Sequence, residues 1–257
     1  MAILQSLVMA LSCFSRIPMP HVEYKPESMR YMMCFFPLVG VIVGLLIWLW
    51  CSIAMAAELN AIMLAAGITL IPIAVTGAIH LDGLADCIDA QASHAAPEKK
   101  REILKDPHTG AFAVIGIACY LLLYFAIATE FKVSAQTILL ICCMHTMSRC
   151  LSAIATLAFP TSTENGMLAS FHVSAERRPS LIAIIIVFLA CAAVMLFVQP
   201  FVASAMIAAG LICFLATRIF ANTQFGGMSG DIAGAFLQIA ELAMLACLVF
   251  FWKAVMG

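Results

Sequence analysis

The stretch His80-Leu-Asp-Gly-Leu-Ala-Asp-Cys-Ile-Asp-Ala-Gln, residues 80–91, gathers three carboxylates directly after the uncharged run 61–79. At 100° per residue, Asp82, Asp86 and Asp89 fall within about 60° of one helical face. Because a charged side chain costs roughly 2.5–3.5 kcal/mol at the bilayer centre, we expect this face at a wet boundary. Carboxylates without a cluster of Cys or His suit Mg²⁺, which usually binds together with phosphate. We interpret the stripe as a Mg²⁺ site, the alternative being a solvated helix start, where acids are also favoured.

The composition around this stretch is that of a membrane protein. Of 257 residues, 64% are hydrophobic and only 11% are charged, whereas soluble domains carry roughly 25% charged residues. Eleven cysteines lie in apolar runs without CxxC spacing, which predicts packing roles rather than disulfides or zinc ligands. We find no basic tract suited to nucleic acid and expect no removable signal peptide.

The apolar segments predict an all-α, polytopic helical bundle that forms a single domain, residues 1–257. Residues 1–14 are apolar but short for a span of about 20 residues, so we expect an interfacial or re-entrant helix there. About seven spans follow, at residues 32–56, 61–79, 111–129, 135–158, 181–199, 201–222 and 232–255. In the first span, Pro37, Gly40 and Gly44 allow kinking and close helix contact.

The basic residues predict the orientation of these spans. Nine Lys and Arg fall in the loops on one side and only Lys132 and Lys253 on the other. By the positive-inside rule the nine face the cytoplasm, which predicts a cytoplasmic (inner) membrane protein. All acidic and glycine motifs then share the cytoplasmic face. A composite site is therefore predicted in the cytoplasmic loops 15–31, 80–110, 159–180 and 223–231.

A glycine-rich turn precedes the last span. Gly226, Gly227 and Gly230 lead into Asp231, and backbone N–H groups at such a helix start can bind phosphate. The turn could instead only cap the helix, with Asp231 as the capping group.

Four cations are candidates to clamp phosphate oxygens: Arg16, Lys105, Arg149 and Arg218. Arg149 lies deep in its span, where a charge either faces a cavity or pairs internally. Glu241 is buried by the same assignment, so functional and structural-pair interpretations both stay open. The basic run 99–101 is interpreted as a topology anchor beside anionic lipid.

Several motifs together resemble the cobalamin synthase family, the adenosylcobinamide-GDP ribazoletransferases. They are His80-Leu-Asp-Gly-Leu-Ala-Asp-x-x-Asp-Ala, Lys105-Asp-x-x-x-Gly110, and Gly226-Gly-x-x-Gly-Asp-x-x-Gly-Ala with Glu241 downstream. Arg16-Ile-Pro and Phe36-Pro-Leu-Val-Gly add to the similarity, which covers nearly the whole chain. Two departures are Ser229, where Thr is usual, and hydroxyl side chains in the loop 159–166, where the family often has a basic residue.

The resemblance implies that α-ribazole, or its 5′-phosphate, attacks the cobinamide-linked phosphorus of adenosylcobinamide-GDP. GMP leaves, and adenosylcobalamin or its phosphate forms. This chemistry fits a Mg²⁺ ion held by carboxylates on a pyrophosphate. Two alternatives are a CDP-alcohol phosphotransferase, whose motif continues differently after its DGxxA opening, and a multi-pass transporter, whose charges would lie near the midplane.

The motifs and the resemblance together nominate the site residues. We predict catalytic roles for Asp82, Asp86, Asp89 and Lys105, and Mg²⁺ ligands in Asp82, Asp86, Asp89 and Asp231. Predicted substrate-binding residues are Arg16, His80, Asp106, Arg149, Arg218, Gly226, Gly227 and Gly230. The predicted partners are the two substrates and the lipid bilayer, with no nucleic acid; a homo-oligomer is left open.

Overall fold

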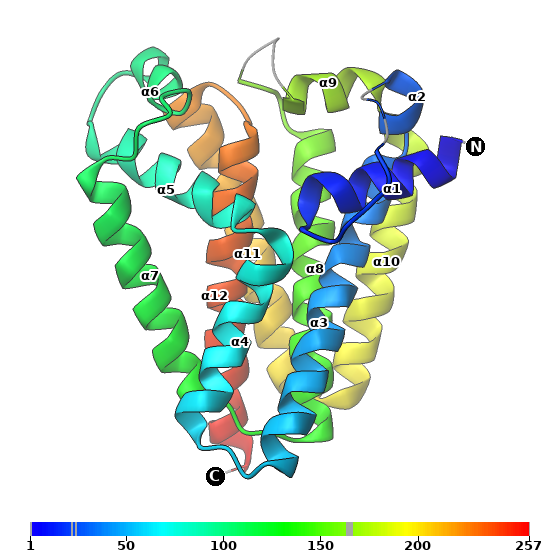
Figure 1. The fold of residues 1–257 in the computed structure, drawn as a ribbon, viewed down its shortest axis with the longest axis vertical. Helices are drawn as coiled ribbons and strands as arrows, with labels where there is room; N and C mark the ends of the chain where they lie inside the picture. Colours follow the sequence, from blue (N-terminus) through cyan, green and yellow to red (C-terminus); the bar gives the residue numbers. More distant parts are fainter. Residues whose placement is uncertain (1, 22, 24, 163–166, 257) are drawn as a thin grey trace.

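The computed structural model describes residues 2–21, 23, 25–162 and 167–256, and the described part is helical (Figure 1). Its helices are α1 (Ala2–Phe14), α2 (Pro26–Met29), α3 (Met32–Ala56), α4 (Ala61–Thr76), α5 (Ile79–Ala92), α6 (Pro97–Ile103), α7 (Ala111–Thr129), α8 (Ala135–Ala158), α9 (Met167–Ser174), α10 (Arg177–Val198), α11 (Pro200–Phe225) and α12 (Gly230–Met256).

The helices that run lengthwise are α3, α4, α7, α8, α10, α11 and α12 (Figure 1). Within the described residues, six are long and apolar enough to cross a membrane, and counting the bent pair α4 and α5 as one span gives up to seven. The predicted polytopic membrane bundle is therefore confirmed. Helix α1 lies across the end of the bundle rather than along it, as expected for an interfacial helix.

Helix α8 forms the centre of the bundle, and small residues let α3 approach it closely. A Cβ atom added at Gly40 would lie 2.3 Å from the carbonyl oxygen of His145, and one at Gly44 would lie 2.9 Å from Cα of Cys142. Contacts of this kind stabilise membrane helices because van der Waals packing drives their association. The close helix contact expected from these two glycines is confirmed.

The predicted second span is shorter than expected and ends in a sharp bend. Gly77 (φ 63°) and Ala78 (φ 64°) are both left-handed, and the axes of α4 and α5 differ by 93°. The backbone N–H of Arg16 donates to the carbonyl of Val75 at 2.8 Å, which supports the end of α4. As a result α5, which carries the acidic stretch, runs across the bundle rather than along it, between α4 and α7 (Figure 1).

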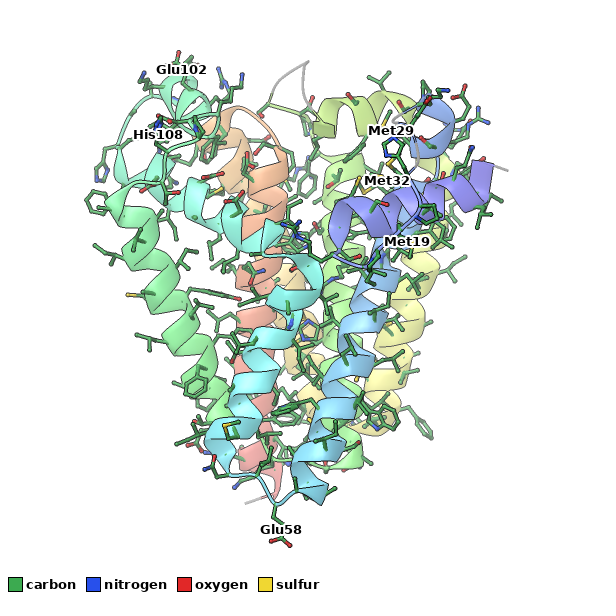
Figure 2. The ribbon with its side chains drawn as sticks, in the orientation of Figure 1. Met19, Met29, Met32, Glu58, Glu102 and His108 are labelled. Carbon is green, nitrogen blue, oxygen red and sulfur yellow. The ribbon has the colours of Figure 1, made fainter. Side chains whose placement is uncertain are left out.

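The polar segments gather at one end of the molecule. Helices α1, α2, α5, α6 and α9 lie at this end (Figure 1), where Glu102 and His108 are found, whereas Glu58 lies at the opposite end (Figure 2). We call it the α6 end. The segment 80–110, predicted as a polar loop, in fact contains the two helices α5 and α6.

Candidate active site

A cavity of about 340 Å³ opens among α1, α3, α5, α6, α8, α9 and the start of α12. Its charged lining comes from two acids, Asp82 and Asp231, and two bases, Arg101 and Lys105. Its hydroxyl groups are those of Ser152, Thr156, Thr161, Ser162 and Ser229. The cavity thus combines opposite charges with hydroxyls, a lining that can bind a phosphate together with a cation.

The two acids meet because helices α5 and α12 cross at glycines. A Cβ atom at Gly83 would lie 2.7 Å from the carbonyl oxygen of Asp231, and one at Gly234 would lie 3.1 Å from Cα of His80. Any larger residue at Gly83 would force the helices apart. The crossing therefore sets how near Asp231 lies to the acidic face of α5.

The charges around Asp86 show how concentrated this acidic region is. Burial raises the pKa of Asp86 to about 6, and the negative charges of Asp82, Asp231 and Asp89 add to the shift. Like charges this close disfavour one another's ionised form. A bound cation would relieve this repulsion.

Asp89 makes a different contact from its two neighbours. Its carboxylate accepts hydrogen bonds from the backbone N–H groups of Gly110, at 2.5 Å, and Ala113, at 2.8 Å. These groups lie at the first turn of α7, where the N–H donors have no partner within the helix. Asp89 therefore holds the start of α7 against α5. Among the residues that the structure describes, no three His, Cys, Asp or Glu side chains form a ready-made metal cluster.

Arg101 is a cavity residue that sequence reasoning missed. The sequence predicts a lipid anchor at residues 99–101. In the structure, however, Arg101 donates to the carbonyl of Phe225 at 2.9 Å, and Lys100 is buried and donates to Gln224 at 2.6 Å. Successive residues of a helix point 100° apart, so the three bases of this run could not all face lipid. This angular spacing is the sequence feature that could have indicated a role other than lipid binding for one of these bases.

The glycine turn is joined to a distant loop. The N–H of Ser162 donates to the carbonyl of Met228 at 2.9 Å, and the N–H of Met228 donates to the carbonyl of Pro160 at 2.7 Å. At Gly227 φ is 150°, and a Cβ atom there would lie 2.6 Å from the nitrogen of Ser162, so this position requires glycine. Gly230 has open space beside it and lines the cavity. Residues 163–166 of the predicted second loop lie outside the described residues.

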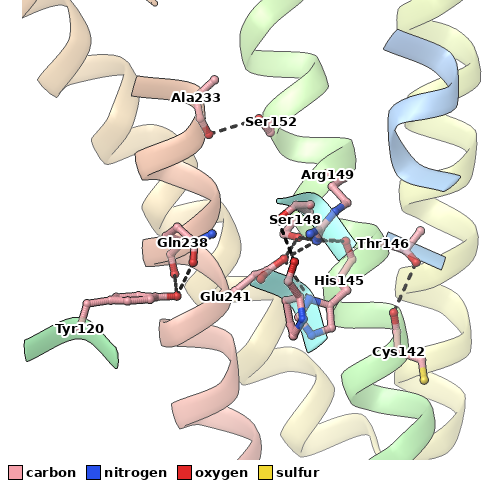
Figure 3. A network of polar contacts seen from close by, with 12 residues as sticks. Tyr120, Cys142, His145, Thr146, Ser148, Arg149, Ser152, Ala233, Gln238 and Glu241 are labelled. Carbon is pink, nitrogen blue, oxygen red and sulfur yellow. Dashed lines mark hydrogen bonds and ion pairs between the residues drawn. The ribbon is translucent and has the colours of Figure 1, made fainter. Parts of the chain in front are cut away.

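Arg149 belongs to an internal network rather than to the cavity lining (Figure 3). Its side chain has no exposed surface, and Nη1 contacts Oε1 of Glu241. Glu241 also accepts from Ser148 Oγ at 2.7 Å and lies 3.0 Å from Nδ1 of His145. Nearby, Tyr120 donates to Gln238 at 2.5 Å. The structural-pair interpretation of Arg149 and Glu241 is the one that the contacts favour.

Four other predicted site residues do not line the cavity. Arg218 is exposed and stands 5.7 Å from the ring centroid of Phe159. Arg16 packs on Gly77 at the bend. Asp106 is exposed and accepts from the N–H of His108 at 2.9 Å, which lowers its pKa. Gly226 ends α11 in the left-handed conformation.

His80 does line the cavity, and it is buried. Burial, followed by the nearby positive charge of Arg149, lowers its pKa to about 3, so its imidazole is neutral. Its ring centroid lies 5.6 Å from that of Phe36. His80 therefore presents an uncharged aromatic surface between the acidic face and the core.

Comparison with known proteins gives a consistent result over nearly the whole chain. A family model described as cobalamin-5-phosphate synthase matches residues 6–249. An adenosylcobinamide-GDP ribazoletransferase of Lachnoclostridium phytofermentans is 39% identical over 93% of this chain and 91% of its own. Proteins of the same name from Clostridium botulinum and Listeria monocytogenes are each 30% identical, over 95% and 97% of this chain and 97% and 99% of theirs. No solved structure matches.

Proposed function

The chain belongs to the cobalamin-5-phosphate synthase family, whose transferase activity it therefore has, and we propose that this transfer takes place in the α6-end cavity with the help of Mg²⁺. The enzyme acts late in cobalamin biosynthesis. This membership decides against the CDP-alcohol phosphotransferase and transporter alternatives. The proposed substrates are adenosylcobinamide-GDP and α-ribazole or its 5′-phosphate, as the names of the relatives indicate.

In the proposed reaction a ribose hydroxyl of the ribazole forms a bond to the cobinamide-linked phosphorus. The bond from that phosphorus to the bridging oxygen breaks, GMP leaves with the bridging oxygen, and the hydroxyl proton passes to a base. Negative charge grows on the leaving oxygen, so catalysis needs positive charge near it. Arg101 and Lys105 supply fixed positive charge in the cavity.

The observation that carries the metal proposal is the meeting of Asp82 and Asp231 at the cavity, with Asp86 one helical turn further along α5. Mg²⁺ is commonly held by one or two carboxylates, with substrate phosphates and water completing its shell, so a cluster complete without substrate is not required. Asp82 and Asp231, which line the cavity, would hold the ion, and Asp86 would add negative charge beside them. Asp89, which is bound to α7, is left out. When bound, Mg²⁺ neutralises pyrophosphate charge.

Replacement of single acids tests this set. In Asp82→Asn and Asp231→Asn, we expect GMP release at saturating Mg²⁺ to fall at least about 100-fold, or to need much higher Mg²⁺, because each loses a ligand charge. Glu102→Gln is the matched control, since Glu102 is an exposed acid that pairs with Lys99 on the surface of α6. The proposal fails if both cavity variants keep a normal Mg²⁺ dependence, or if the unmodified enzyme needs no divalent ion.

We further propose that the α6 end faces the cytoplasm, because the basic loops gather there. Single cysteines in a cysteine-depleted chain test the orientation. Ala95→Cys, near the start of α6, should resist an impermeant thiol reagent on intact cells, and Glu58→Cys, at the opposite end, should react. The reverse labelling pattern would contradict the proposed orientation. A homo-oligomer stays an untested prediction.

A further inference from the structure

The cavity has two chemically different sides. Its charged groups come from α5, α6 and the start of α12. The other side is formed by α1, α3 and α9 and carries Phe14, Met33, Phe36, Leu168 and Phe171. In Figure 1, α1 and α9 lie on one side of the α6 end and α6 on the other. The cavity therefore suits a ligand that is apolar at one end and polar at the other.

The apolar side is a cluster of aromatic rings, which we call the aromatic wall: Phe14, Phe36 and Phe171. The ring centroids of Phe14 and Phe36 are 4.3 Å apart, and those of Phe14 and Phe171 are 6.4 Å apart in an edge-to-face arrangement. The ring of His80 stands 5.6 Å from that of Phe36 and extends the wall toward Asp82. Phe36 and Phe171 are almost fully buried, whereas Phe14 is half-buried. Phe14 therefore offers the open ring face, and the buried rings of Phe36 and Phe171 hold that ring in place.

We propose that the aromatic wall binds the heterocyclic base of the ribazole substrate, so that its ribose hydroxyl lies toward Arg101, Lys105 and the acidic face. This inference rests on the proposed function, because it needs the transfer to occur in this cavity. It adds the side chains that recognise the attacking substrate. Bases stack on aromatic side chains because every base has a π face, and the wall is the aromatic surface among the described lining residues.

The size and polarity of the cavity exclude the other two bulky groups from this wall. A volume of about 340 Å³ is at the small end of ligand sites; it suits a nucleoside but not a corrin macrocycle, which must stay outside. Guanine carries donors and acceptors on its edge, and these would be left unpaired against Phe, Met and Leu side chains. A benzimidazole-type base has few such groups, so burial against these rings favours it.

Equilibrium binding to the purified full-length protein in detergent tests the proposal, with α-ribazole 5′-phosphate as the probe and EDTA present. Without metal and without the second substrate, the signal reports binding of the ribazole substrate alone. Phe14→Leu keeps an apolar side chain but removes the open stacking ring, and Phe171→Leu removes the buried ring that supports it. We expect each to weaken ribazole phosphate binding about 5- to 100-fold. Phe197→Leu is the matched control, because Phe197 is 92% exposed on α10.

Two further measurements separate the outcomes. In the metal-dependent assay the Leu variants should raise KM for the ribazole and leave KM for adenosylcobinamide-GDP unchanged. Asp82→Asn should lose turnover yet still bind ribazole phosphate in EDTA, so that failure of the metal proposal and failure of this one are told apart. The assignment would be overturned if both Leu variants bound ribazole phosphate normally, or if the unmodified protein did not bind it. It would also be overturned if the Leu variants lost GMP binding to the same extent as ribazole phosphate binding.

Discussion

The buried pair Arg149–Glu241, which joins α8 to α12, allows a direct test of whether Arg149 stabilises the fold or binds phosphate. Both side chains are at most 2% exposed, and the same Glu241 oxygen also contacts Ser148. Removal of one partner of such a pair leaves an uncompensated buried charge, which costs about 3–5 kcal/mol. For a domain of this size 1 kcal/mol corresponds to about 2–4 °C in Tm. We therefore expect Arg149→Met to lower Tm by about 6–20 °C.

The double variant Arg149→Met/Glu241→Leu removes both charges together, and apolar replacement of a buried pair is often neutral. We expect its Tm, measured in one detergent, to lie within about 5 °C of the unmodified enzyme. KM for adenosylcobinamide-GDP should also be unchanged, because Arg149 is not exposed to the cavity. A stable double variant with a strongly raised KM would refute this reasoning and restore Arg149 as a phosphate ligand.

Three more predictions concern the cavity and its support. Gly83→Ala should weaken Mg²⁺ activation of GMP release about 10-fold or more, because the added Cβ would press on the backbone of Asp231. Gly230→Ala is the steric control for folding yield, because Gly230 has open space beside it. Because Asp89 caps α7, Asp89→Asn should lower the free energy of unfolding by about 1 kcal/mol in thermal unfolding. The Mg²⁺ dependence of the variant should stay normal, and a changed Mg²⁺ dependence would show that Asp89 is a metal ligand. Arg101→Met should raise KM for adenosylcobinamide-GDP about 10-fold or more, and an unchanged value in steady-state assays would remove it from the site.

The sequence by itself determined the architecture and the family. Uncharged runs of about 20 residues have few alternatives to membrane helices, because an unpaired backbone group in lipid is too costly. The acidic stretch and the glycine turn identified the family from the order of their residues along the chain alone. The bend after α4 escaped prediction, since the left-handed conformation of Ala78 depends on its surroundings.

Only the tertiary structure decided how the polar residues divide their roles. Asp82, Asp86 and Asp89 share a helical face and look equivalent in sequence, yet Asp89 bonds to the start of α7. Likewise Arg101 reaches the cavity, while Arg149 pairs with Glu241 far along the chain. The physical reason is that a charge takes its role from the partner it meets across the bundle. Helix periodicity fixes which face a residue occupies, whereas packing of distant helices fixes what that face touches.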